Sequence, residues 1–243
     1  MIDAAGPACV AMKPQLACFE RLGAAGWSAL VAVAAHARAA GLLVLADAKR
    51  GDIDVSAAAY AEALVGSTPT PFGVVAGLGA DAFTASPYLG RDAVEAFVGV
   101  ARPAGAGVFV LVRTSNPGAR DLQELALTHG GPVWERAAAL VDALGEPGAS
   151  GLDDVGAVAA ATAPEHLARL RELMPRAVFL LPGVGAQGGK VETLAAAFGG
   201  RKAGALVTAS RSIVDAGAAS GRPPDAAARA EAERLRAAAW ALI

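Results

Sequence analysis

Residues 42–52 read Leu-Leu-Val-Leu-Ala-Asp-Ala-Lys-Arg-Gly-Asp, an unbroken apolar run that ends in a cluster of charge. The apolar run predicts a strand over Leu42–Asp47 that is buried on both faces, because a half-buried strand would alternate polar and apolar residues. Such strands are typical of parallel sheets covered by helices. The charged residues that follow place candidate chemistry at the carboxyl end of this strand.

The same pattern recurs along the chain, where short apolar runs alternate with alanine-rich segments of helical period. Seven strands are predicted, at Cys9–Lys13, Leu42–Asp47, Asp81–Ser86, Gly107–Arg113, Val155–Ala160, Ala177–Leu181 and Ala205–Thr208. Helices are predicted at Gly26–Ala40, Val55–Leu64, Arg91–Ala101, Pro132–Leu144, Pro164–Leu173, Lys190–Phe198 and Asp225–Leu242, with surface insertions at Ser67–Ala80 and Gly145–Asp154. Regular β-then-α alternation predicts an α/β fold.

The predicted architecture is a TIM (β/α)8-type barrel in which residues 1–243 form a single domain. A closed barrel of this type has eight strands, one more than the pattern provides, so an open doubly wound sheet is the alternative. Polar residues cluster where the predicted strands end, which is how barrel enzymes are built.

Composition narrows the class of protein. Hydrophobic residues make up 54% of the chain and charged residues 18%, which excludes a disordered chain. The net charge of −2 gives no basic excess for nucleic acid, and no uncharged apolar run is long enough to span a membrane. Two cysteines cannot build a disulfide scaffold, so we expect a cytoplasmic protein; three widely spaced histidines argue against a His-rich metal site.

The strongest chemical signal is the Asp-x-Lys-x-x-Asp pattern of Asp47, Lys49 and Asp52. Residues two apart on a strand share a face, so Asp47 and Lys49 are expected to point together, and Gly51 lets Asp52 turn back or reach a neighbour. Two carboxylates around one ammonium would keep that lysine protonated. A solvated charge cluster is the alternative, but Lys13 ends the preceding predicted strand on the same rim and favours an alternating acid–base network.

Residues 182–189 read Pro-Gly-Val-Gly-Ala-Gln-Gly-Gly and contain a literal G-x-G-x-x-G. A dinucleotide fingerprint is one interpretation, but the motif comes late and lacks an acidic residue roughly 20 positions on. A phosphate-binding loop is simpler, built from free N–H groups, a helix N-terminus and the Gln187 amide; a flexible turn is the structural alternative. Arg211 follows the next strand and pairs well with phosphate, so the two loops together favour a phosphate site.

A third polar stretch, Thr114-Ser-Asn-Pro, lies beside the same rim. Its hydroxyl and amide groups could read the edge of a ring that carries carbonyl and N–H functions. From the residues alone an ordinary turn or helix cap is favoured.

Together these motifs resemble the orotidine 5′-phosphate decarboxylases of the second sequence type. The resemblance rests on Lys13-Pro-Gln with Phe19-Glu, residues 47–53, Ser86-Pro-Tyr-Leu-Gly, Thr114-Ser-Asn-Pro, Val155-Gly-Ala-Val with Ala161-Thr-Ala-Pro, and residues 182–189, all in the family's order. It implies an eight-stranded barrel, a homodimer, orotidine 5′-monophosphate as substrate, and neither metal nor organic cofactor.

The resemblance also implies roles for individual residues. Lys13 would contact the ribose, Asp47 would lie near the substrate carboxylate, and Lys49 would protonate C6 after CO2 leaves. Asp52 would be offered across the dimer interface. Ser115 would contact the pyrimidine. Gln187 and Arg211 would bind the 5′-phosphate, and the glycine-rich loop carrying Gln187 would close over it. The remaining substrate contacts would come from Ser56, Pro182 and Gly185.

The sequence departs from the family in one large respect and several small ones. The family has a strand before Lys13 that bears a ribose-binding aspartate, and only twelve residues precede Lys13 here, so we expect the first strand to be missing. Smaller departures lie at residues 54–56, 159–160 and 208–210. Two alternatives follow: a truncated, inactive homologue that at most binds nucleotides, and a sugar-phosphate enzyme such as a hexulose-phosphate synthase, which uses a similar cluster with Mg²⁺.

Overall fold

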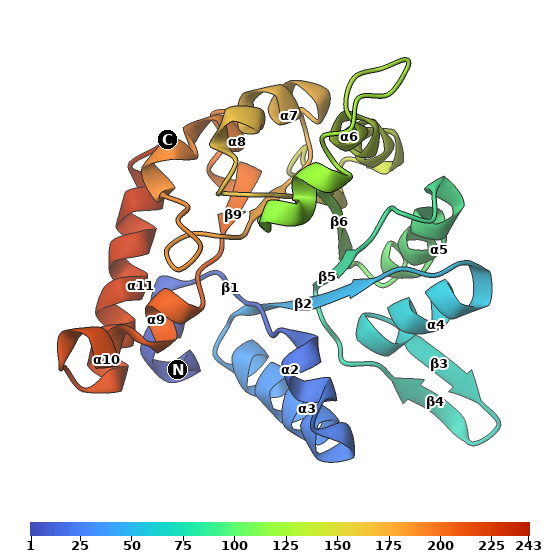
Figure 1. The fold of residues 1–243 in the computed structure, drawn as a ribbon. Coiled ribbons are helices and arrows are strands. Elements are labelled where there is room, and N and C mark those ends of the chain that lie inside the picture. The colour runs from blue at the N-terminus through green and yellow to red at the C-terminus, as the bar shows by residue number, and fades with distance from the viewer. The chain divides into compact units, whose positions relative to one another are not determined.

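The computed structural model describes residues 1–243, apart from the surroundings of the Ala219 side chain. The chain divides into two compact units, each built from strands and helices (Figure 1). The N-terminal unit holds Ile2 and Cys9–Val108, and the C-terminal unit holds Met1, Asp3–Ala8 and Phe109–Ile243. The boundary falls inside one strand, β6 (Gly107–Arg113), which begins in the first unit and ends in the second.

The N-terminal unit is a parallel sheet with helical crossovers. Its elements are β1 (Ala11–Met12), α2 (Leu16–Glu20), α3 (Gly23–Ala39), β2 (Leu43–Arg50), α4 (Asp54–Leu64), β3 (Ser67–Thr70), β4 (Gly73–Ala76), β5 (Ala82–Ala85) and α5 (Arg91–Ala101). Strand β2 pairs in parallel with β1 on one side and β5 on the other. Val44, Phe83 and Phe97 are completely buried, as expected for strands and a helix that meet in a core.

The predicted insertion at Ser67–Ala80 is an antiparallel hairpin formed by β3 and β4 (Figure 1). Both strands are largely exposed, and Phe72 at the turn is fully exposed. Pro69 and Pro71 obscured the hairpin in the sequence, because proline is depleted in strands and demotes a strand prediction.

The C-terminal unit repeats the strand–helix alternation. Its elements are α1 (Ile2–Ala5), η1 (Gly6–Ala8), β6, η2 (Pro117–Asp121), α6 (Val133–Leu144), β7 (Val155–Ala159), η3 (Pro164–His166), α7 (Leu167–Leu173), β8 (Phe179–Leu181), η4 (Val191–Thr193), α8 (Ala195–Phe198), η5 (Lys202–Gly204), β9 (Ala205–Val207), α9 (Arg211–Val214), α10 (Ala216–Ser220) and α11 (Pro224–Trp240). Strand β8 pairs in parallel with β7 and β9. The α/β class and its parallel strands are therefore confirmed.

The predicted helix over Lys190–Phe198 is wrong as a single helix. It is a 3-10 turn, η4, followed by the one-turn helix α8, with Leu194 between them outside helical geometry. The segment ends at Gly199, whose φ of 57° lies in the left-handed region that favours glycine. The short helices α1, α2, α9 and α10 were not predicted, because four or five residues carry too little periodicity.

A half-buried arginine connects several elements of the C-terminal unit. The Arg171 guanidinium of α7 donates hydrogen bonds to the carbonyl oxygens of Ala197 (2.6 Å), Ala177 (2.8 Å) and Gly204 (3.0 Å), and lies 3.9 Å from the centre of the Phe179 ring. Burial, with a smaller contribution from nearby Arg201, lowers the pKa of Arg171 to about 10, so the group stays charged at neutral pH. The positive charge of Arg171 is stabilised by these backbone carbonyl groups and by the face of the Phe179 ring.

We expect Arg171→Met to lower the free energy of unfolding by about 3 kcal/mol, because several buried carbonyl groups lose their donor. Arg169→Met, on the same helix, is the matched control: Arg169 pairs with Glu135 and Glu172 at an exposed site, so it should cost less than about 1 kcal/mol. Urea denaturation measures both. Equal losses would contradict the structural role of Arg171.

Candidate active site

The carboxyl end of β2 carries one buried carboxylate between two ammonium groups. Asp47 is only 7% exposed. The Lys13 ammonium donates to its Oδ2 at 2.6 Å, and the Lys49 ammonium donates to its Oδ1. Within this chain Asp52 does not join Asp47 at the Lys49 ammonium, and its carboxylate instead accepts a hydrogen bond from the N–H of Ile53 (2.8 Å).

Backbone pairing brings Lys13 to the cluster. The segment after β1 continues alongside β2, so that Gln15 bridges Asp47 and the Asp47 N–H donates to the Pro14 carbonyl oxygen (3.0 Å). The predicted convergence of the two strand ends is correct for this pair.

The orientation of Lys49 has a different cause from the one predicted. Lys49 has a φ of 47°, in the left-handed region, and the register of β2 against β5 shifts between Ala46 and Arg50. The simple alternation of a regular strand therefore fails at this point. A local irregularity in β2, and not a shared strand face, directs Lys49 back to Asp47.

Opposite charge keeps Asp47 ionised despite its burial. Burial alone raises the pKa of the carboxyl group. The charges and hydrogen bonds of Lys13 and Lys49 together lower the pKa by more than burial raises it. The net pKa lies below the ordinary value of 3.8. At neutral pH the site is thus a carboxylate that holds two ammonium groups at fixed positions.

In the C-terminal unit, the glycine-rich loop follows β8. Gly183, Gly185 and Gly188 all have positive φ, which explains why glycine stands at these positions. The N–H groups of Gly185, Gly188 and Gly189 donate to carbonyl oxygens of the loop itself. The prediction of free N–H groups is therefore wrong for these three glycines. The predicted helix N-terminus after the loop is also wrong, because the segment begins with a 3-10 turn.

Three loops of this unit meet around Gly183. A Cβ on Gly183 would lie 2.9 Å from Thr162 Cγ2, 3.2 Å from Gln187 Oε1 and 3.3 Å from Ser115 Cβ. The Thr162 hydroxyl also donates to the Ser115 carbonyl oxygen (3.2 Å). Ser115 and Gln187, two predicted substrate contacts, are thus brought together by the absence of a side chain at one glycine.

The loop also contacts the helix that begins with Arg211. A Cβ on Gly185 would lie 3.1 Å from Ser212 Cβ, and the side chain of Arg211 is exposed at the start of α9. Pro182 is half-buried, and its carbonyl oxygen accepts the N–H of Ala161 (2.9 Å). Ser56 lies exposed on α4, in the N-terminal unit.

Sequence reasoning missed two supporting residues. Thr84 of β5 is 1% exposed and donates to Asp47 Oδ1 (3.1 Å). The Gln123 side chain bonds both the N–H (2.9 Å) and the hydroxyl of Thr114 (2.8 Å), which fixes the loop carrying Ser115. The sequence contains a weak indication of the role of Thr84, because a hydroxyl stands inside an otherwise apolar strand. No feature of the sequence indicates the role of Gln123.

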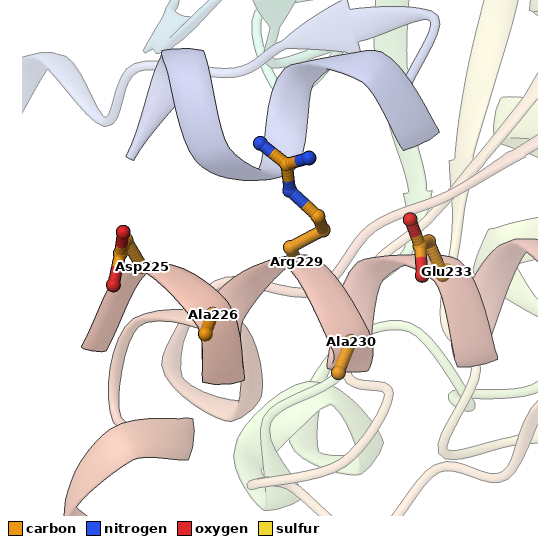
Figure 2. A pocket seen from close by; sticks show the side chains of 5 residues that line it. All are labelled: Asp225, Ala226, Arg229, Ala230 and Glu233. Atoms are coloured by element: carbon orange, nitrogen blue, oxygen red, sulfur yellow. The ribbon is translucent and has the colours of Figure 1, made fainter. Parts of the chain in front are cut away.

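A shallow depression of about 330 Å³ lies elsewhere, along α11. It is lined by Asp225, Arg229 and Glu233 with two alanines, all from that one helix (Figure 2). It contains none of the predicted site residues. Exposed charges one turn apart on a single helix describe a solvated surface.

The described residues lack both a metal-binding cluster and a membrane-spanning helix. They contain no group of three or more His, Cys, Asp or Glu side chains placed to hold a metal ion. No described helix combines the length and apolar character that crossing a membrane requires.

The fold and the cluster define an α/β enzyme that concentrates charge at the carboxyl ends of parallel strands. The family model "Orotidine 5′-phosphate decarboxylase / HUMPS family" matches residues 1–229. Curated orotidine 5′-phosphate decarboxylases from Rhodopirellula baltica and Deinococcus radiodurans are 46% and 44% identical; the matches cover 88% and 90% of this chain and 70% and 78% of the relatives.

Solved structures of similar proteins support the same family. The structure of Leishmania donovani OMP decarboxylase is 35% identical with a TM-score of 0.76, and the match covers 98% of this chain and 85% of that one. Leishmania donovani UMP synthase is 36% identical with a TM-score of 0.76; the match covers 99% of this chain but 49% of the synthase. This chain belongs to the orotidine 5′-phosphate decarboxylase family, whose members are lyases with a TIM-barrel fold.

The Asp47 cluster predicts a pH-dependent stability. Because the pKa of Asp47 is lowered on folding, its contribution is present above pH 3.8 and is lost as the pH falls through the lower folded value. We expect Asp47→Asn to cost about 2 to 3 kcal/mol at neutral pH, since it leaves two ammonium groups without their partner. The difference from the unsubstituted chain should shrink below pH 3.8. Chemical denaturation across pH measures it, and a difference that is constant with pH would contradict the ionised carboxylate.

Proposed function

We propose that this chain decarboxylates orotidine 5′-monophosphate to UMP and CO2 in pyrimidine biosynthesis. The observation that carries the proposal is the buried Asp47 carboxylate held between Lys13 and Lys49. Family membership supports it, because the curated relatives bear the name of this activity.

The proposed reaction breaks the bond between C6 and the carboxylate carbon of the substrate. CO2 leaves, and the electron pair stays on C6. The Lys49 ammonium then donates a proton to C6 and later regains one from solvent, so the reaction consumes one proton overall. A cation already in place when charge develops at C6 lowers the barrier, because no reorganisation is needed at that moment.

The other residues of the cluster have supporting roles in this proposal. Asp47 lies near the substrate carboxylate and holds the Lys49 ammonium in place through its Oδ1. Lys13 balances Asp47 from its other oxygen and contacts the ribose. Lys49 is 44% exposed at its side chain and Lys13 is 18% exposed, which leaves the proton donor the more accessible of the two to a ligand.

The substrate-binding roles are assigned by family resemblance together with local geometry. Gln187 and Arg211 bind the 5′-phosphate, with Pro182 and Gly185 shaping the loop. Ser115 contacts the pyrimidine, and Ser56 completes the contacts from α4. The N–H groups of Gly185, Gly188 and Gly189 already bond within the loop, which supports a part for the Gln187 amide and the Arg211 fork in phosphate recognition.

We also propose that residues 1–243 act as one catalytic domain in the cytoplasm, with no nucleic-acid or membrane partner. The family match over both units and the strand that they share support a single domain. A cooperative unfolding transition in urea would agree with this proposal, and two separate transitions would contradict it.

The chain is further proposed to form a homodimer in which Asp52 serves the partner's site. Exposed apolar side chains flank Asp52: Ile53 is 49% exposed, Val55 82% and Tyr88 77%. The loops that carry them adjoin, since the Ser86 N–H donates to the Arg50 carbonyl oxygen (2.7 Å). Clustered exposed apolar residues are typical of protein interfaces.

We expect Lys49→Ala to lower the turnover of orotidine 5′-monophosphate about a thousandfold, because the proton donor and its charge are lost. Ultraviolet absorbance of the substrate measures turnover. Lys202→Ala is the control, since Lys202 packs over the Trp240 ring outside the site, and it should retain full activity.

Three outcomes are decisive for the Lys49 experiment. Unchanged activity in Lys49→Ala would overturn the proposed role. An unsubstituted chain that binds UMP without turnover would favour an inactive homologue. Loss of activity on adding EDTA would favour the Mg²⁺-dependent sugar-phosphate chemistry.

Mixing two inactive variants tests the shared site. In a dimer of Lys49→Ala with Asp52→Asn, one site lacks both residues and the other has both. Random reassortment of equal amounts should therefore restore about a quarter of the activity of the unsubstituted dimer. Mixtures that stay inactive, with heterodimers demonstrated by native mass spectrometry, would show that Asp52 does not cross the interface.

A further inference from the structure

Strand β2 becomes irregular just where the proposed proton donor lies. It pairs with β5 at Ala46↔Phe83 and next at Arg50↔Ala85. Between these two pairs β2 therefore contains more residues than β5 does. Lys49 falls inside this irregularity and has a φ of 47°. A side chain larger than glycine is disfavoured in the left-handed region, so something must hold Lys49 there.

The hydroxyl of Thr84 spans the irregularity. It accepts a hydrogen bond from the backbone N–H of Lys49 (2.8 Å) and donates one to Asp47 Oδ1 (3.1 Å). Thr84 is 1% exposed and lies on the neighbouring strand, between Phe83 and Ala85. One buried hydroxyl therefore fixes both the backbone of the lysine and the carboxylate that the lysine contacts.

The Thr84 hydroxyl must accept from the Lys49 N–H and donate to the Asp47 carboxylate, because neither neighbour can take the opposite role. A hydroxyl has one proton to give and lone pairs to accept with. The Lys49 N–H has left the regular ladder and needs an acceptor, and the Asp47 carboxylate accepts only. Valine has nearly the shape of threonine but can do neither.

We propose that Thr84 is a positioning residue that holds Lys49 in its left-handed conformation and so aims the Lys49 ammonium at the reacting carbon. The inference rests on the proposed decarboxylase function and extends it to a residue that is only 1% exposed. The hydroxyl acts through Lys49 and Asp47.

The test compares Thr84→Val with Thr84→Ser. Removal of the hydroxyl in Thr84→Val should lower kcat at least about tenfold while KM stays within about threefold, because misplacement of a catalytic group affects the chemical step more than binding. Thr84→Ser keeps the hydroxyl and should stay within about threefold of the unsubstituted chain in both. Thr193→Val, which removes an exposed hydroxyl bonded to the Lys190 carbonyl oxygen, is the matched control and should leave kcat unchanged.

A measurement without substrate separates this proposal from the proposed function. The chain has four lysines, Lys13, Lys49, Lys190 and Lys202, so nitrogen-15-lysine labelling gives a backbone amide spectrum in which loss of a peak in Lys49→Arg assigns Lys49. Hydrogen exchange of that amide should be slow in the unsubstituted chain and in Thr84→Ser, and at least about tenfold faster in Thr84→Val. Thr84→Ala takes the place of Thr84→Val if the latter does not fold.

The outcomes are distinct. A hydroxyl-free variant with kcat within twofold of the unsubstituted chain overturns the proposal, as does an unchanged exchange rate at Lys49. Equal loss of kcat in Thr84→Ser and Thr84→Val also overturns it, since that result reports packing alone. If the unsubstituted chain turns over no orotidine 5′-monophosphate, the decarboxylase function fails, and the exchange rate alone decides whether Thr84 holds Lys49.

Discussion

A buried carboxylate that stays ionised is the constraint on which the candidate active site depends. Burial opposes the charge on Asp47, and the two ammonium groups of Lys13 and Lys49 outweigh that cost. The lysines stabilise the carboxylate, and the carboxylate in turn fixes the positions of the two ammonium groups. A cation fixed in place stabilises the electron pair that the proposed reaction leaves on carbon.

The surrounding sheet supplies the geometry that the cluster needs. Lys13 arrives because the chain after β1 runs alongside β2, and Lys49 turns back because β2 departs from regular pairing. Thr84 satisfies the backbone group that this departure exposes. In the other unit, small residues act in a comparable way: glycine at 183 lets Ser115, Thr162 and Gln187 approach one another.

Much of this organisation could be predicted from the sequence. The apolar runs gave β6 its observed bounds of Gly107–Arg113 and the periodic pattern gave α5 its bounds of Arg91–Ala101. The approach of Lys13 to Asp47 followed from parallel strands whose carboxyl ends meet. These features depend on periodicity and on the polarity of neighbouring strands, both of which a single sequence contains.

Other features depend on tertiary contacts that periodicity does not encode. The left-handed Lys49 and its bond to Thr84 arise from a shift in register between two strands. The helix expected at Lys190–Phe198 breaks at Leu194, and three glycine N–H groups of the glycine-rich loop bond within the loop. Asp52 bonds the next backbone N–H, where the charge pattern alone suggested a second carboxylate beside the lysine.

The most direct test of the central claim is the titration of the Asp47 carboxyl group itself. Carbon-13 labelling of aspartate, with the Asp47 signal assigned by its loss in Asp47→Asn, follows that group by NMR as the pH falls. An ionised carboxylate held between two ammonium groups should titrate below 3.8, the ordinary value for aspartate. A midpoint at or above that value would show that burial outweighs the lysines, and the charge network would not exist as described.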